Sequence, residues 1–184
     1  MKKAGLYIHI PFCKVKCVYC DFYSITKREK QIPLFTECLL KEIDLYKEYS
    51  EKWSFDTIFF GGGTPSILPA KYLEQILQKL HDTFDTSKVT EISLEANPGE
   101  APFEHLKDIK SLGVNRISMG FQSFDDKILK LLGRLHEAKD CFNTFKNVRK
   151  AGFDNINADM IFNIPGLSVN NWKKDLNTLL ELDP

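Results

Sequence analysis

The sequence predicts an α/β fold in which a parallel sheet curves into a partial barrel. Three observations support this prediction. Apolar runs typical of buried strands alternate with segments whose apolar residues recur at helical spacing. The same helix–glycine–strand junction occurs twice, at 112–114 and 151–153. Finally, the segments rich in cysteine, glycine and polar residues follow the predicted strands, where ligands bind in such folds.

The first half of the chain contains the first three predicted strands. The apolar run 6–10 ends at a proline, and apolar residues then recur at helical spacing over 35–46. The second strand, 56–60, ends at three consecutive glycines. A helix over 69–84 begins with a proline, which suits a first helical turn, and the third strand covers 89–94.

The second half continues the alternation. A helix over 102–112 ends at Gly113 and leads into a strand at 114–119. Two helices at 125–132 and 139–151 precede the fifth strand, and a last helix follows it; these elements cover 156–162 and 172–182. About five βα units in sequence order predict the curved sheet, with an open doubly wound sheet as the alternative. Because no closing strand follows the last helix, we expect residues 1–184 to form one incomplete domain.

Composition and charge restrict the possible partners. Apolar and charged residues make up 43% and 27% of the chain, as in ordinary soluble proteins. The formal net charge is 0, which argues against broad electrostatic binding of nucleic acid. The first apolar run is short and contains His9 and Pro11, so neither a signal peptide nor a membrane span is expected. We therefore expect a cytoplasmic protein.

Three of the five cysteines, Cys13, Cys17 and Cys20, lie within eight residues. A structural zinc site needs four protein ligands, and an ordinary cubane takes four cysteines. Three thiolates on a [4Fe–4S] cluster leave one iron open. S-adenosylmethionine (SAM) suits that iron, because its amino and carboxylate groups can chelate it, and an electron from the cluster can then cleave the sulfonium to a 5′-deoxyadenosyl radical.

Other interpretations of the cysteines remain open. One is a zinc site completed by His9 or a distant residue, and another is a chance cluster of buried cysteines. Cys38 and Cys141 lie beside apolar residues on predicted helices, so both are expected in the core.

Several motifs occur in one order along the whole chain, and together they resemble one branch of the radical SAM family. This branch contains oxygen-independent coproporphyrinogen III dehydrogenase (HemN) and the haem chaperone HemW. The resemblance implies a partial (β/α) barrel of radical SAM type. The matching segments are 6–13, 17–22, 60–66, 95–98, 120–124, 132–136 and 159–166.

The resemblance also implies which residues bind SAM. Tyr7 would lie against SAM, and Tyr19 would pack near the cluster and SAM. The segment Gly62, Gly63 and Thr64 would meet the methionine part of SAM, where glycine permits close backbone approach. Its polar groups would be held by Glu95, Gln122, Arg134 and Asp159. Arg134 would pair with a carboxylate.

Two histidines are left with alternatives. His9 either lines the pocket or is a core histidine whose hydrogen bonds are satisfied, and the second interpretation is favoured. His136 either touches a ligand or is a solvated loop residue.

The segment 21–24 resembles HemW rather than HemN, because it lacks a further cysteine directly after Cys20. The resemblance then implies a chaperone that binds haem and transfers it to acceptor proteins. It also implies an electron donor as a further partner. The haem-binding motif of that branch lies in a C-terminal region beyond these residues. Two alternatives remain, which are oxidation of coproporphyrinogen III and another radical SAM reaction. The oligomeric state is not predicted.

Overall fold

The computed structural model describes residues 2–184 and confirms the predicted α/β fold. Five of the seven strands in this range form one parallel sheet in the order β1-β4-β5-β6-β7. Their order in the sheet is their order in the chain. A doubly wound sheet reverses its strand order midway, so the curved-sheet prediction holds and that alternative does not. The strands are β1 (Lys2–Ile10), β4 (Trp53–Gly62), β5 (Glu91–Ala96), β6 (Arg116–Gln122) and β7 (Asn155–Met160).

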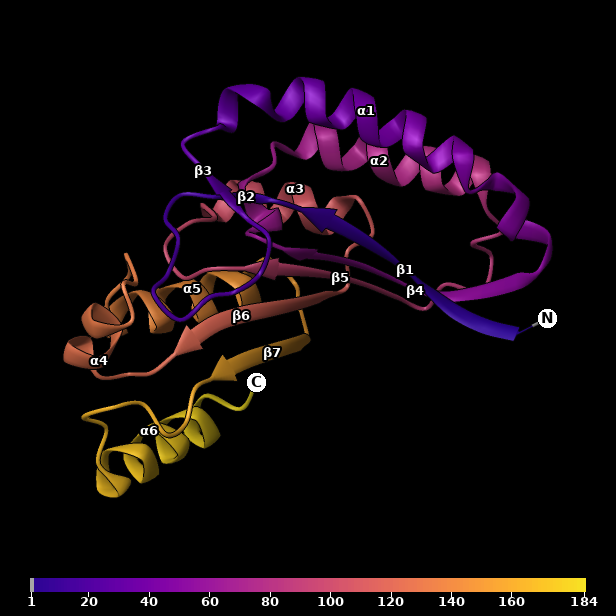
Figure 1. Cartoon of the computed structure of the whole chain (residues 1–184). Helices are drawn as coiled ribbons and strands as arrows, with labels where there is room; N and C mark the ends of the chain where they lie inside the picture. Colours follow the sequence, from indigo (N-terminus) through magenta and orange to yellow (C-terminus); the bar gives the residue numbers. More distant parts are fainter. Residues whose placement is uncertain (1) are drawn as a thin grey trace.

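Helices connect the strands and cover the outer side of the sheet (Figure 1). Helices α1 and α2 lie together above β1 and β4, and α6 lies beyond β7 at the other end. The bounds are α1 (Ile32–Leu45), α2 (Ala70–Thr83), α3 (Phe103–Ser111), α4 (Asp126–Leu131), α5 (Ala138–Lys150) and α6 (Val169–Leu182). Short 3-10 helices occur at η1 (Glu29–Gln31), η2 (Lys47–Glu51) and η3 (Pro65–Ile67). Over residues 2–184, no helix is both long and apolar enough to cross a membrane.

The apolar core lies between the sheet and its helices. Ile8 and Ile10 of β1 share it with Leu73, Ile76 and Leu80, which form the buried stripe of α2. Burying each such side chain contributes about 1.5–3 kcal/mol of transfer free energy. This packing fixes the strand register and therefore the positions at which the strands end.

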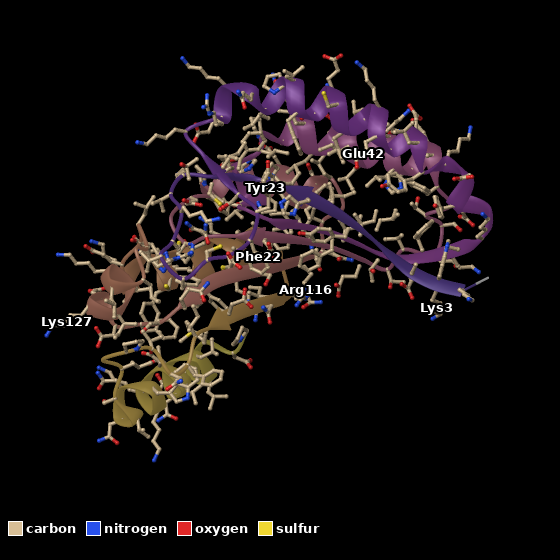
Figure 2. All side chains as sticks on the ribbon, viewed as in Figure 1. Lys3, Phe22, Tyr23, Glu42, Arg116 and Lys127 are labelled. Atoms are coloured by element: carbon tan, nitrogen blue, oxygen red, sulfur yellow. The ribbon has the colours of Figure 1, made fainter. Side chains whose placement is uncertain are left out.

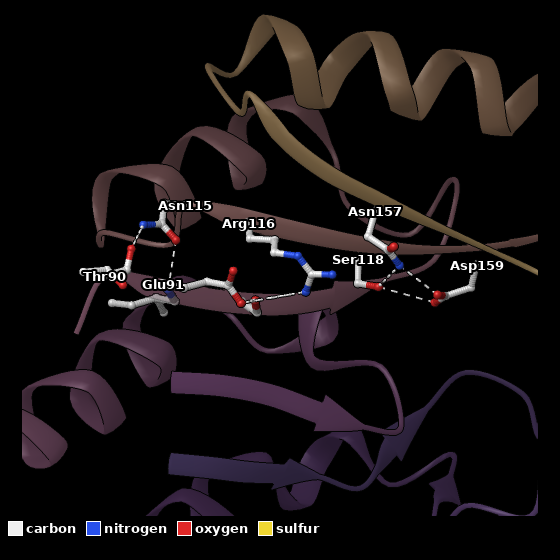
Figure 3. A network of polar contacts seen from close by, with 9 residues as sticks. Thr90, Glu91, Asn115, Arg116, Ser118, Asn157 and Asp159 are labelled. Carbon is white, nitrogen blue, oxygen red and sulfur yellow. Dashed lines mark hydrogen bonds and ion pairs between the residues drawn. The ribbon is translucent and has the colours of Figure 1, made fainter. Parts of the chain in front are cut away.

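The inner face of the sheet is polar, in contrast to the packed interior of a complete α/β barrel. On this face Arg116 Nη1 donates to Ser93 Oγ at 3.2 Å. Further along, Asn157 Nδ2 donates to Ser118 Oγ at 2.9 Å and to Asp159 Oδ1 at 2.8 Å (Figure 3). Polar side chains on this face suit a ligand rather than a second apolar layer.

A small two-stranded ladder was not predicted. Its strands, β2 (Phe12–Cys13) and β3 (Ile25–Thr26), pair in parallel and close the loop that carries the other two clustered cysteines. Strands of two residues have no measurable periodicity. The pairing therefore depends on contacts that only the folded chain provides.

The two remaining cysteines differ. The buried positions of α1 include Ile32, Thr36 and Ile43, and Cys38 lies on the exposed side. The prediction that Cys38 is a core residue is therefore wrong, because its apolar neighbour Leu39 is nearer the buried stripe. Cys141 is completely buried, as predicted, and burial raises the pKa of its thiol to about 12.

Candidate functional site

A cavity of about 570 Å³ lies at the carboxyl ends of the strands, in the size range of small-molecule sites. Its walls combine the cysteine loop, the ends of β4 to β7 and the segment after α4. Every residue predicted to bind the cluster or SAM lines this cavity except Tyr7. These lining residues are Cys13, Cys17, Tyr19, Cys20, Gly62, Gly63, Thr64, Glu95, Gln122, Arg134 and Asp159.

The cysteine loop crosses the strand ends and is held by backbone hydrogen bonds. Val18 N donates to Leu132 O at 3.3 Å, and Ile25 N donates to Pro11 O at 2.8 Å. Phe22 and Tyr23 are largely exposed on this loop, which Figure 2 shows over the sheet. The clustered cysteines are half-buried and not in disulfides. Burial raises the pKa of the Cys13 thiol, and the Thr64 hydroxyl opposes that rise.

The glycines at the end of β4 are needed for contacts within the protein. A side chain on Gly63 would lie 2.6 Å from Phe12 O, and Gly63 N donates to Ile10 O at 2.8 Å. Gly62 has a φ of 111°, and a side chain there would meet the His9 ring. The segment thus fastens the start of the cysteine loop to the sheet, in addition to any approach it offers a ligand.

Two carboxylates give one wall of the cavity an acidic character. Glu95 Oε2 accepts from Gly62 N at 3.0 Å. Burial raises the pKa of Glu95, the Gly62 N–H opposes this, and the charge of Asp159 raises it further. A cationic group between Glu95 and Asp159 would relieve this repulsion.

Arg134 adds a positive charge to the cavity lining, although protein groups already engage its guanidinium. Nη2 donates to Asn97 Oδ1 at 2.6 Å and to Gly120 O at 2.8 Å. Nη1 lies 3.5 Å from Cys17 Sγ and 3.4 Å from the Tyr19 hydroxyl. Within residues 2–184, the buried Nε–H has no partner. A buried donor without a partner fits a wall built against a polar ligand.

Gln122 combines a cavity-lining side chain with an unusual backbone. Its φ is 69°, in the left-handed region that favours glycine. The register of β6 against β7 shifts between Gly120 and Gln122, and Ile161 N donates to Gln122 O at 3.0 Å. Such conformations concentrate at functional sites because surrounding structure must impose them.

Tyr7 lies near the cavity but does not line it. Its ring flanks Gly61, and both burial and the Glu95 charge raise the pKa of its hydroxyl. His9 Nε2 lies 2.9 Å from Tyr23 O, so this nitrogen carries the proton and donates. His9 Nδ1 then accepts from the Tyr7 hydroxyl at 3.0 Å. His9 is thus satisfied and outside the cavity lining, but it is half-buried, so the prediction that it is a core residue is wrong.

The remaining tyrosine and histidine of the site are both perturbed by burial. Partial burial raises the pKa of Tyr19 to about 12, and the charge of Arg134 opposes this. His136 is buried, lines the cavity and donates from Nε2 to Phe121 O at 3.2 Å. The interpretation of His136 as a solvated loop residue is therefore wrong. Burial, followed by the charge of Arg134, lowers the pKa of His136 to about 4, so it is neutral at pH 7.

Sequence reasoning missed further residues of the cavity wall, among them Asn97. It follows Glu95 by two positions at the end of β5 and bonds Thr64, Glu100 and Arg134. Its place directly after a strand was the available signal. Without the fold, however, that position does not distinguish it from an ordinary turn asparagine.

The donor set fits a cluster better than a single ion. Across the part of the chain that the structure describes, no three His, Cys, Asp or Glu side chains are grouped to hold one metal ion. A compact four-ligand zinc site is therefore not formed. A four-iron cluster instead binds each thiolate through a different iron. Its cysteine ligands can therefore be spread around one cavity. Two carboxylates and a guanidinium in the lining of one cavity suit a zwitterionic cofactor such as SAM.

Comparison with protein families gives one match over most of the chain. The model described as "Radical SAM superfamily" matches residues 7–179. The chain is 37% identical over 181 residues to the haem chaperone HemW of Lactococcus lactis subsp. lactis (strain IL1403), covering 98% of this chain and 47% of that protein. The HemW of Bacillus subtilis (strain 168) is 37% identical over 184 residues, 48% of its length. The chain spans about half the length of these relatives.

The fold has a match among solved structures. The structure of coproporphyrinogen III oxidase (HemN) from Escherichia coli, reported as a radical SAM enzyme, superposes with a TM-score of 0.89 at 28% identity. The superposed region covers 100% of this chain and 42% of the HemN chain. These matches confirm the resemblance inferred from the motifs.

Proposed function

The chain belongs to the radical SAM superfamily, and on this premise we propose that it forms the cluster- and SAM-binding core of a haem chaperone. Cys13, Cys17 and Cys20 would hold a [4Fe–4S] cluster with one iron open. The observation that carries the proposal is that these thiols share one cavity with Glu95, Asp159 and Arg134. The HemW relatives support the choice of chaperone. Haem would be cargo, passed to acceptor proteins, and we assign no haem ligand on this chain.

The polar residues of the cavity would orient SAM. A bound cluster would supply an electron to the sulfonium of SAM. Glu95 and Asp159 would attract its cationic groups, the Arg134 guanidinium would pair with its carboxylate, and the Gln122 side chain would bond its polar edge. Tyr19 would pack against the cofactors. Tyr7 would act from its place beside Glu95 by orienting His9, which donates to Tyr23 O on the cysteine loop.

The first experiment tests the cluster. The chain is incubated anaerobically with iron and sulfide, and bound iron, sulfide and visible absorption are measured. Cys17→Ala should lose the cluster. The matched control Cys38→Ala should retain it, because Cys38 is exposed on α1 away from the cavity. Equal loading of both variants would contradict the assignment of Cys17.

The second experiment separates the haem chaperone from the other candidate, coproporphyrinogen III oxidation, which the match to HemN favours. The full-length protein, loaded with cluster, is offered haem and, separately, coproporphyrinogen III with SAM and a reductant, because the haem-binding motif implied by the resemblance lies beyond residue 184. Stoichiometric haem binding without conversion of coproporphyrinogen III supports the chaperone. Formation of protoporphyrinogen IX supports the oxidase and contradicts the chaperone.

A further inference from the structure

Asn97 connects Thr64 and Glu100 to Arg134 in the cavity lining, and these partners fix the orientation of its amide. Nδ2 donates to Glu100 Oε2 at 3.0 Å and to Thr64 Oγ1 at 2.9 Å, and Oδ1 accepts from Arg134 Nη2 at 2.6 Å. A carboxylate only accepts and a guanidinium only donates. A flipped amide would place its oxygen against Glu100 and its NH₂ against Arg134. The network thus allows one orientation.

This orientation decides what the Thr64 hydroxyl does. Because its oxygen accepts from Asn97 Nδ2, its proton remains available for another acceptor. Cys13 Sγ lies 3.6 Å from Thr64 Oγ1, within hydrogen-bond distance for sulfur. Asn97 therefore directs the Thr64 proton toward the first cysteine. Thr64 is almost completely buried, so water does not compete freely for that proton.

The other side of the same amide holds the Arg134 guanidinium. Asn97 Oδ1 and Gly120 O both accept from Nη2. Since the guanidinium is planar and rigid, fixing Nη2 also fixes the direction of Nη1. Nη1 then lies 3.5 Å from Cys17 Sγ. One amide thereby aims a donor at each of two clustered cysteines.

We infer that Asn97 is a positioning residue that sets the reduction potential of the cluster through Thr64 and Arg134. Donors to the sulfurs of an iron–sulfur cluster raise its potential, because they stabilise the additional negative charge of the reduced form. The inference rests on the proposed function, in which Cys13 and Cys17 are cluster ligands. It requires no change in the ligands themselves.

The test is a mutant cycle read out as a midpoint potential in an anaerobic redox titration followed by electron paramagnetic resonance. Asn97→Asp keeps the shape and the bond to Arg134, but an ionised carboxylate cannot donate to Thr64. The Thr64 hydroxyl then turns toward the introduced carboxylate and away from Cys13. Thr64→Val removes the same hydroxyl at nearly constant volume.

In the wild-type background, Thr64→Val should shift the midpoint potential to more negative values. The equilibrium constant for reduction of the cluster should fall about tenfold. In the Asn97→Asp background the same substitution should cause little further shift, because the bond to Cys13 is already lost. Asn143→Asp adds the same charge on an exposed position of α5 and should leave the potential near that of wild type. Asn97→Ala provides a second background without added charge, in which the Thr64→Val shift should also shrink.

Equal Thr64→Val shifts in all three backgrounds would overturn the inference, and so would the absence of any shift in the wild-type background. Either result leaves the proposed function standing, since both require a bound cluster. A wild-type chain that takes up no iron and sulfide would instead overturn the proposed function, and the inference with it.

Discussion

At the scale of single residues, the cavity depends on buried polar groups whose charge state and backbone are set by their surroundings. His136 is neutral because burial lowers its pKa to about 4. Gln122 is held in a left-handed conformation by the shifted register of β6 and β7. Both features can be tested without knowing the ligand.

The His136 prediction concerns acid stability. In the unfolded chain the imidazole titrates near 6.5, and in the folded protein it titrates near 4. Between these values the unfolded state binds more protons, so stability is complete above pH 6.5 and falls as the pH approaches 4. The total loss is about 3 kcal/mol. Urea unfolding at a series of pH values should show a flatter profile for His136→Gln than for wild type. An unchanged profile would refute this.

The Gln122 prediction concerns backbone strain. Gln122→Val places a β-branched residue at a positive φ and should lower the free energy of unfolding by about 1–2 kcal/mol. Gln122→Gly removes the same side chain, but glycine tolerates this φ, so its loss should be smaller. The two variants are compared by urea denaturation. If glycine proved as destabilising as valine, the left-handed backbone would not be the cause.

At the scale of elements, α6 is attached to the segment after β6 by a buried polar pair. Ser123 Oγ donates to Asp175 Oδ2 at 2.6 Å, and Asp125 N donates to Ser123 Oγ at 3.1 Å. Ser123 and Asp175 are both buried. The pair therefore connects the last helix to the strand that carries Gln122.

Ser123→Ala should lower the free energy of unfolding by about 2 kcal/mol, because it removes a donor from a buried carboxylate. Ser111→Ala, at an exposed position on α3, should change it by less than about 0.5 kcal/mol. Chemical denaturation of both variants gives the comparison. Equal effects would mean that the buried pair does not stabilise α6.

The elements also show how far sequence reasoning reaches. Each strand of the large sheet was predicted because its apolar run ends at a glycine, proline or polar segment, and those ends located most of the site. The β2–β3 ladder was missed because strands of two residues are too short to show an alternation of apolar and polar residues. The position of Cys38 was wrong because an apolar neighbour does not identify the buried face of α1. The role of Asn97 could not be predicted, since its partners Thr64, Glu100 and Arg134 come from separate segments.

At the scale of the whole molecule, the cavity joins segments from the cysteine loop to β7, so a ligand there should stabilise much of the fold. SAM at a hundredfold excess over its dissociation constant should raise the free energy of unfolding of the cluster-loaded chain by about 2.7 kcal/mol. Thermal unfolding with and without SAM measures this. The cluster-free Cys17→Ala variant should show little increase. An equal increase in both would show that SAM does not use the open iron.

The β2–β3 ladder has a consequence for how the cluster enters. Joining Phe12 and Cys13 to Ile25 and Thr26 closes the cysteine loop in the polypeptide itself. The chain therefore loses the conformational entropy of this loop when it folds, and not when it takes up the metal. Iron and sulfide should accordingly enter a loop that is already closed. Oxidative loss of the cluster should leave a folded protein that reloads without first refolding.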